Sequence, residues 1–292
     1  AGGNSATAVG SATIAVNGTQ GTNLNVRTVF GGNNQAEMGI VPNVALTSGK
    51  VDTVYGGGNA GDMTGSNNDG NSTYVEINSS NIQVQEVYGG CNAANVSYNS
   101  VVNMQEGHVG TIYGGNNVSG TISGQTLVTL AGGTVTGSVF GGSNGDYGCN
   151  DGSVYTSGIY STPTAKTLPV SNATKVVVDG DCEISGSIYG GGNMAPVGTS
   201  ASNNGNAVVE LTSGNVTGNA FAGGRMADVY GFATIYTTAI SSIQINNVYG
   251  GNDIAGSVSN STSTARTSTI GNGATTTLDE TVALTGANAA SY

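Results

Sequence analysis

One short phrase occurs eight times along the chain and constrains its fold more than any other feature. The phrase has an apolar residue, an aromatic residue, two glycines, a variable residue and usually Asn. Its aromatic residues are Phe30, Tyr55, Tyr88, Tyr113, Phe140, Tyr189, Phe221 and Tyr249, separated by 25, 33, 25, 27, 49, 32 and 28 residues. Its Asn residues are Asn34, Asn59, Asn92, Asn117, Asn144 and Asn193. A unit of 25 to 33 residues predicts a repeat architecture.

Before each phrase the chain reads as a strand, a tight turn and a second strand. Examples are ALTSGKVDTVYGG from Ala45 and VVVDGDCEISGSIYGG from Val176, where apolar and polar residues alternate. The turn slot holds Ser-Gly, Gly-Gly, Asp-Gly or Glu-Gly, in which Gly can take a positive φ. The two glycines and the Asn of the phrase tolerate left-handed backbone, which predicts a second bend there.

Each unit is therefore expected to be a β-arch, and successive arches should stack in register about 4.8 Å apart. We predict an all-β fold, a β-solenoid or stacked β-arch array of about eight repeats with almost no helix, because strong helix formers are scarce. Residues 1–292 form one domain, with an insertion at about 146–171. Equivalent residues should form ladders: the eight aromatic rings a stack, and the six Asn residues an amide ladder.

The composition excludes several functions. Only 8% of the residues are charged and the net charge is −11, which argues against binding to nucleic acid. No apolar run approaches the roughly 20 residues of a membrane-spanning helix. The glycine-rich phrases are not followed by Lys-Ser/Thr and no GxSxG motif occurs, so we expect no cofactor and no enzyme activity.

The few residues that could carry chemistry have structural interpretations. His108 follows Gly107 in a turn slot, where an exposed His is expected. Asp179, Asp181 and Glu183 form the densest acidic cluster, which we interpret as a turn; a carbohydrate-active β-helix that uses these acids is a less favoured hypothesis. The run at 141–146 is similar to a calcium-binding repeat, but Asn144 replaces a Gly and the spacing differs, so no metal site is predicted.

The cysteines and the insertion supply the remaining candidates. The three cysteines have no CxxC spacing, and Cys149 and Cys182 flank the insertion, so they are the expected disulfide. Cys91 would then be buried, free or available to another subunit. The insertion carries Tyr147, Tyr155 and Tyr160, aromatic residues that could contact a ligand.

The first and last strand-like segments, at 11–16 and 281–284, carry no Lys or Pro that would block an open sheet edge. Open edges favour joining to other copies of the chain, and a head-to-tail contact of this kind generates filaments, rings or sheets. We therefore expect a structural role in which the main partner is the chain itself.

The aromatic-glycine arches, from about Val26 to Asp253, resemble secreted β-solenoid repeats of microbial cell surfaces. These include adhesin passengers and the sheath-forming β-arch proteins of methanogenic archaea. The resemblance implies an extracellular or cell-surface protein that builds a sheath, layer or fibre. The alternative is an adhesin or virus-fibre segment that binds other cell-surface components or glycans through the insertion at 146–171.

Overall fold

The structure is a computed structural model that describes residues 3–6, 12–18, 24–65, 71–145, 158–159, 173–199, 205–258, 267–271 and 275–279. These residues form an all-β parallel β-solenoid without a helix, which confirms the predicted fold class. The solenoid has about six turns, fewer than the eight repeats expected. The outermost coils are not described throughout, because residues 7–11, 19–23 and 259–266 lie outside the described part.

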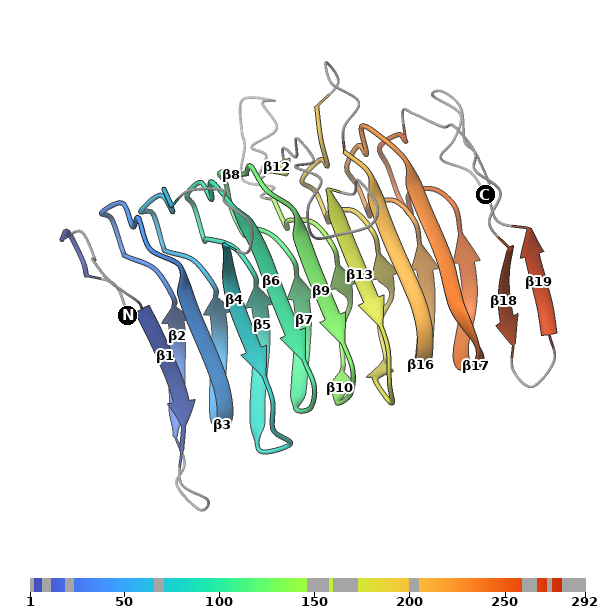
Figure 1. Cartoon of the computed structure of the whole chain (residues 1–292), viewed down its shortest axis with the longest axis horizontal. Coiled ribbons are helices and arrows are strands. Elements are labelled where there is room, and N and C mark those ends of the chain that lie inside the picture. Colours follow the sequence, from blue (N-terminus) through green and yellow to red (C-terminus); the bar gives the residue numbers. More distant parts are fainter. Residues whose placement is uncertain are drawn as a thin grey trace.

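Two faces of parallel strands run along the solenoid and enclose its core (Figure 1). The first face is formed by β1 (Ala12–Asn17), the first half of β3 (Pro42–Tyr55), β4 (Ser72–Ile77), β6 (Asn99–Met104), β9 (Thr126–Leu130), β13 (Thr174–Val178) and the first halves of β16 (Ala207–Phe221) and β17 (Ala233–Tyr249). In Figure 1 each strand of this face points downward, and the strands follow one another along the solenoid from β1 to β17.

The second face returns in the opposite direction behind the first (Figure 1). It contains β2 (Asn25–Phe30), the second half of β3, β5 (Ile82–Tyr88), β7 (His108–Tyr113), β10 (Thr134–Val135) with β11 (Val139–Phe140), β14 (Glu183–Ile184) with β15 (Ile188–Tyr189), and the second halves of β16 and β17. Two smaller pairs complete the described strands: β8 (Thr121–Ile122) with β12 (Gly158–Ile159), and the antiparallel β18 (Thr267–Gly271) with β19 (Thr275–Asp279).

The main core lies between the two faces and consists mainly of Val, Ile and Leu. Strand alternation places one apolar residue of each coil above its equivalent in the previous coil, as Val44, Val75 and Val102 show. A second, smaller core lies beneath the loops that follow the phrases. It contains Met63 and Val96, which form isolated parallel bridges, so each coil has a short third side.

The turn slots follow the prediction from the sequence. Gly49, Gly107, Gly133, Gly180 and Gly214 all have positive φ, between 83° and 113°. These glycines belong to the Ser-Gly, Glu-Gly, Gly-Gly and Asp-Gly pairs that end the first face. At this position an L side chain would strain the backbone, so Gly lets the chain reverse at low cost.

The glycines of the repeated phrase are required for a reason other than the left-handed backbone that the sequence predicted. Among the described residues, none of them has a positive φ. A Cβ on Gly90 would instead lie 2.1 Å from Oδ1 of Asn116 in the next coil, and one on Gly56 would lie 2.2 Å from the carbonyl oxygen of Gly89. The phrase requires Gly because successive coils approach too closely there for a side chain.

The turn glycines generate a first prediction. Replacing Gly107 by Ala strains a residue at φ +102° and places its Cβ 2.9 Å from Cγ2 of Ile82. The Gly107→Ala variant should therefore lose about 1–3 kcal/mol of unfolding free energy, measured by urea denaturation. Gly39→Ala is the matched control, because its Cβ would meet nothing within 4 Å. Equal stability of the two variants would contradict the proposed role of the turn.

Candidate functional site

The eight aromatic residues of the phrase form one continuous stack. Register pairing places Phe30 beside Tyr55, and the series continues coil by coil to Tyr249. Neighbouring ring centroids are 4.6–5.1 Å apart and the ring planes differ by 3–12°. The six inner rings are buried, whereas Phe30 and Tyr249 at the ends are partly buried. The stack is thus a column of buried rings that runs along the solenoid.

The six Asn residues of the phrase form a second column beside the rings. Each side-chain Nδ2 donates a hydrogen bond to Oδ1 of the Asn in the preceding coil. The N–O distances are 2.6 Å for Asn59 to Asn34, 2.8 Å for Asn92 to Asn59, 3.0 Å for Asn117 to Asn92, 2.8 Å for Asn144 to Asn117 and 2.9 Å for Asn193 to Asn144. The column is an amide ladder in which every bond points the same way.

The ring stack and the amide ladder are joined by hydrogen bonds. The Tyr55 hydroxyl donates to Oδ1 of Asn92 at 3.2 Å and accepts from Nδ2 of Asn117 at 2.9 Å. In the seventh copy Arg225 replaces Asn, and its Nη1 donates to Oδ1 of Asn193 at 3.1 Å. In the eighth copy Asp253 accepts from the Tyr189 hydroxyl at 2.8 Å. These replacements keep the column hydrogen-bonded where the phrase departs from its pattern.

The variable residue of the phrase has a structural role that the sequence did not reveal. Asn116 is fully buried, and its Oδ1 accepts from the backbone N–H of Cys91 at 2.7 Å. Ser143 accepts from Asn116 N–H at 2.9 Å, and Asn252 from Gly224 N–H at 2.8 Å. Short polar side chains thus satisfy backbone donors of the preceding coil. The recurrence of Asn, Ser and Cys at this position is the signal that could have identified them.

A row of buried hydroxyl groups was also missed. Thr73, Ser100, Thr126 and Thr174 occupy equivalent positions at or near the starts of four strands of the first face and are all fully buried. Each hydroxyl donates to the carbonyl oxygen of the first glycine of its own phrase, at 2.5–2.7 Å. The sequence signal for these hydroxyls was a Thr or Ser at a position where strand alternation predicts an inward-facing apolar residue. These bonds close each coil.

The expected disulfide is not formed at Cys182. Cys182 is a free thiol that is fully buried in the main core, where its sulfur packs among apolar side chains, and Cys149 lies outside the described residues. Cys91 is also free and buried, and its Sγ accepts from Gly58 N–H at 3.2 Å. Burial raises the pKa of both thiols to about 12, so neither is a reactive thiolate at neutral pH.

The residues considered for catalysis are all exposed. Asp179 and Asp181 lie in the turn between β13 and β14, Glu183 begins β14, and His108 begins β7. In the described part of the chain, no group of three His, Cys, Asp or Glu residues could hold a metal ion. Tyr147, Tyr155 and Tyr160 of the insertion lie outside the described residues, so their role as ligand contacts stays a prediction.

The two ends of the solenoid present strand edges. Among the described strands, β1 and β2 pair only with β3, and β17 pairs only with β16, although β18 lies beside β17 in Figure 1. Some core positions at these ends are partly exposed, namely Ile14 and Val26 at one end and Ile245 and Val248 at the other. The interior equivalents Val44 and Val51 are 0% and 2% exposed. Other core positions on the end strands, such as Val16 and Ile243, are buried.

The first described residues extend the amide ladder by one further coil. Asn34 Nδ2 donates to Oδ1 of Asn4, and Gly3 N–H donates to Oδ1 of Asn33 at 2.7 Å. Gly3 and Asn4 therefore occupy the places of the variable residue and the Asn of the phrase.

Comparisons with protein families, with curated proteins and with solved structures give no match to this chain. Within the described residues, no helix has the length and hydrophobicity needed to cross a lipid bilayer. The features of the site are therefore those of its geometry: stacked rings, hydrogen-bonded amides, and end strands that pair on one side only among the described strands.

The ring stack generates a second prediction. Tyr113 lies between Tyr88 and Phe140, with centroid distances of 4.8 and 4.9 Å. Tyr113→Ala should cost about 3–5 kcal/mol of unfolding free energy, because it removes a buried ring from the column. Tyr113→Phe keeps the ring and should change stability little. Chemical denaturation followed by circular dichroism compares the two, and a Phe variant as unstable as the Ala variant would refute a stacking role.

A third prediction concerns alkaline pH. Burial, reinforced by the negative charge of Glu86, raises the pKa of Tyr113 from 10 to about 12. The unfolded chain loses this proton near pH 10 while the folded chain keeps it, so the stabilisation is present below pH 10 and is lost as the pH rises to about 12. Denaturation at a series of pH values should show this fall, with a shallower slope for Tyr113→Phe. A pH-independent stability across this range would argue against it.

Proposed function

We propose that this protein is a structural component of an extracellular surface layer, sheath or fibre. Copies of the chain stack head to tail through the strand edges at the two ends of the solenoid. The partner of each edge is thus a second copy of the same chain. The extracellular location rests on the resemblance of the repeated arches to secreted β-solenoid repeats.

The observation that carries the proposal is the partial exposure of the core at both ends. Ile14 and Val26 begin rows that are buried one coil further in. At the other end Ile245 closes the row of Val26, and Val248 closes the row that begins at Val29. A second copy stacked on either end would cover these side chains. Each square ångström of apolar surface removed from water would contribute about 25 cal/mol.

Backbone groups support the same arrangement. An edge strand presents N–H and C=O groups that can pair with a further strand, and a parallel edge accepts a strand of the same direction. The exposed residues of β1, Thr13, Ala15 and Asn17, carry no charge that would oppose pairing, and Arg27 on β2 is the exposed charge of this end among the described strands. Because the two ends of the solenoid differ, stacking joins unlike surfaces, and such a contact builds a filament when its rotation does not close into a ring.

The ladders add specificity to the stacking. Tyr249 ends the ring series on Phe221 and is partly buried, so a further ring could continue the column there. Stacked rings are worth about 0.5–1.5 kcal/mol beyond the area they bury. A copy that docks out of register would lose these contacts as well as the match of the core rows.

A fourth prediction tests the assembly. Ala15 is exposed on β1, and Ala15→Lys places a charge on the edge strand. This variant should form fewer and shorter assemblies than the unaltered chain, as measured by analytical ultracentrifugation and negative-stain electron microscopy over a concentration series. Its circular dichroism spectrum should stay that of a β protein.

Thr129→Lys is the matched control, because Thr129 occupies the same row as Ala15 but lies on the interior strand β9. It should assemble as the unaltered chain does. If the unaltered chain stays monomeric at high concentration, or if both variants assemble equally, edge stacking is not the function of these ends.

A further inference from the structure

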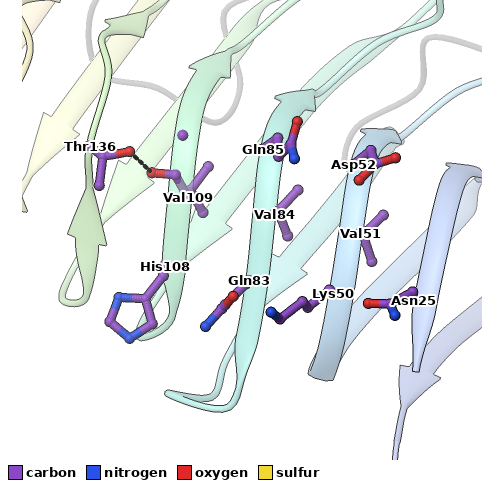
Figure 2. Close-up of a pocket in the computed structure, with 11 residues that line it drawn as sticks. Asn25, Lys50, Val51, Asp52, Gln83, Val84, Gln85, His108, Val109 and Thr136 are labelled. Atoms are coloured by element: carbon purple, nitrogen blue, oxygen red, sulfur yellow. Dashed lines mark hydrogen bonds between the residues drawn. The ribbon is translucent and has the colours of Figure 1, made fainter. Parts of the chain in front are cut away.

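A groove of about 380 Å³ lies on the outer side of the second face and begins at β2, the strand of this face at the N-terminal end. It crosses β2, β3, β5 and β7, and its lining includes Asn25, Lys50, Gln83 and His108. Figure 2 shows these four side chains in a row on adjacent strands. They are register partners, one from each coil, and all are exposed.

The depth of the groove has a cause in the sequence. Asp52 and Gln85 form a second outward row, and in the next coil this row holds Gly110, which has no side chain. One coil further on, Val135 and Val139 are four residues apart, whereas their partners Val109 and Ile112 are three apart. The extra residue closes the groove at Thr136, whose hydroxyl donates to the carbonyl oxygen of Val109 at 3.4 Å.

The groove offers unused hydrogen-bonding groups. None of the side chains of Asn25, Lys50, Gln83, Gln85 and His108 forms a hydrogen bond with another described residue. Lys50 and Asp52 carry opposite charges and lie close together in sequence, so the groove has little net charge. A ligand that fits it is therefore neutral and rich in hydrogen-bonding groups rather than ionic or apolar.

The spacing of the groups selects the kind of polymer. Successive coils repeat about every 4.8 Å, whereas an extended peptide advances about 3.3 Å per residue and would fall out of step with them. A β-linked hexose chain advances by nearly one coil spacing per sugar. Each sugar could then present its hydroxyl groups to the same row of amide, ammonium and imidazole groups.

We propose that this groove binds a linear, neutral polysaccharide whose sugar units follow the coils, one unit to each of the four strands that line it. The amide groups of Asn25 and Gln83 donate to and accept from sugar hydroxyls, and the Lys50 ammonium donates to them. The site uses outward side chains, and three of its four strands, β3, β5 and β7, lie inside the solenoid, so it does not require that copies of the chain stack.

Isothermal titration calorimetry of the full chain with neutral β-1,4-linked tetrasaccharides of glucose, mannose and N-acetylglucosamine tests the proposal. At least one should bind, and Gln83→Ala should weaken its binding about fivefold, the effect of one lost hydrogen bond. The matched control is Gln244→Ala, because Gln244 is exposed in the same row but on β17, outside the groove. Its affinity should equal that of the unaltered chain.

Three results would overturn the proposal. One is the absence of heat and of chemical-shift change with every neutral tetrasaccharide at millimolar concentration. Another is binding that Gln83→Ala and Gln244→Ala weaken equally, which would place the sugar elsewhere. The third is binding restricted to a uronic-acid oligosaccharide and abolished by salt, which would mean that the ligand is recognised by charge.

Discussion

Hydrogen bonding between parallel coils is the interaction on which the rest of this structure depends. It fixes the coil spacing and the register, so each side chain has its own equivalent as a neighbour above and below. A residue is therefore suitable at a position only if it can stack on a copy of itself or on a close substitute. Rings meet rings from Phe30 to Tyr249, and amides meet amides from Asn34 to Asn193.

The same constraint explains why charged residues are few. Two like charges in one row would face each other at the coil spacing and destabilise the stack. The strand acids avoid this arrangement: Glu86 pairs with Thr53 and Thr111, and Glu183 pairs with Thr134 and Asn215. Only 8% of the chain is charged, in keeping with this rule. Amides and hydroxyls can repeat along a row without this cost, because each is both a donor and an acceptor.

Much of the fold could be predicted because a repeat reveals which positions are equivalent. The eight aromatic phrases, the alternating strands and the turn glycines at positions such as Gly107 and Gly214 were all recognisable before the structure was known. Knowing which positions are equivalent does not, however, reveal how closely successive coils approach each other on the third side. For this reason the role of Gly90 beneath Asn116 was misread as backbone freedom.

Other features of the site could not be predicted from the sequence, for related reasons. Cys182 is buried in the main core from the turn just before β14, a placement that the distance along the sequence to Cys149 does not reveal. The buried hydroxyl of Thr126 bonds to Gly141 within its own coil, a contact that depends on how the two faces meet. The groove depends on a one-residue difference between neighbouring coils, which averaging over the repeats conceals.

The one-way amide ladder gives the molecule a direction. Every Asn donates toward the N-terminal end and accepts from the C-terminal side, so the side-chain dipoles add along the column instead of cancelling. A fibre built from such units would be vectorial, with two chemically distinct tips. Growth at the donor tip and growth at the acceptor tip would then proceed at different rates.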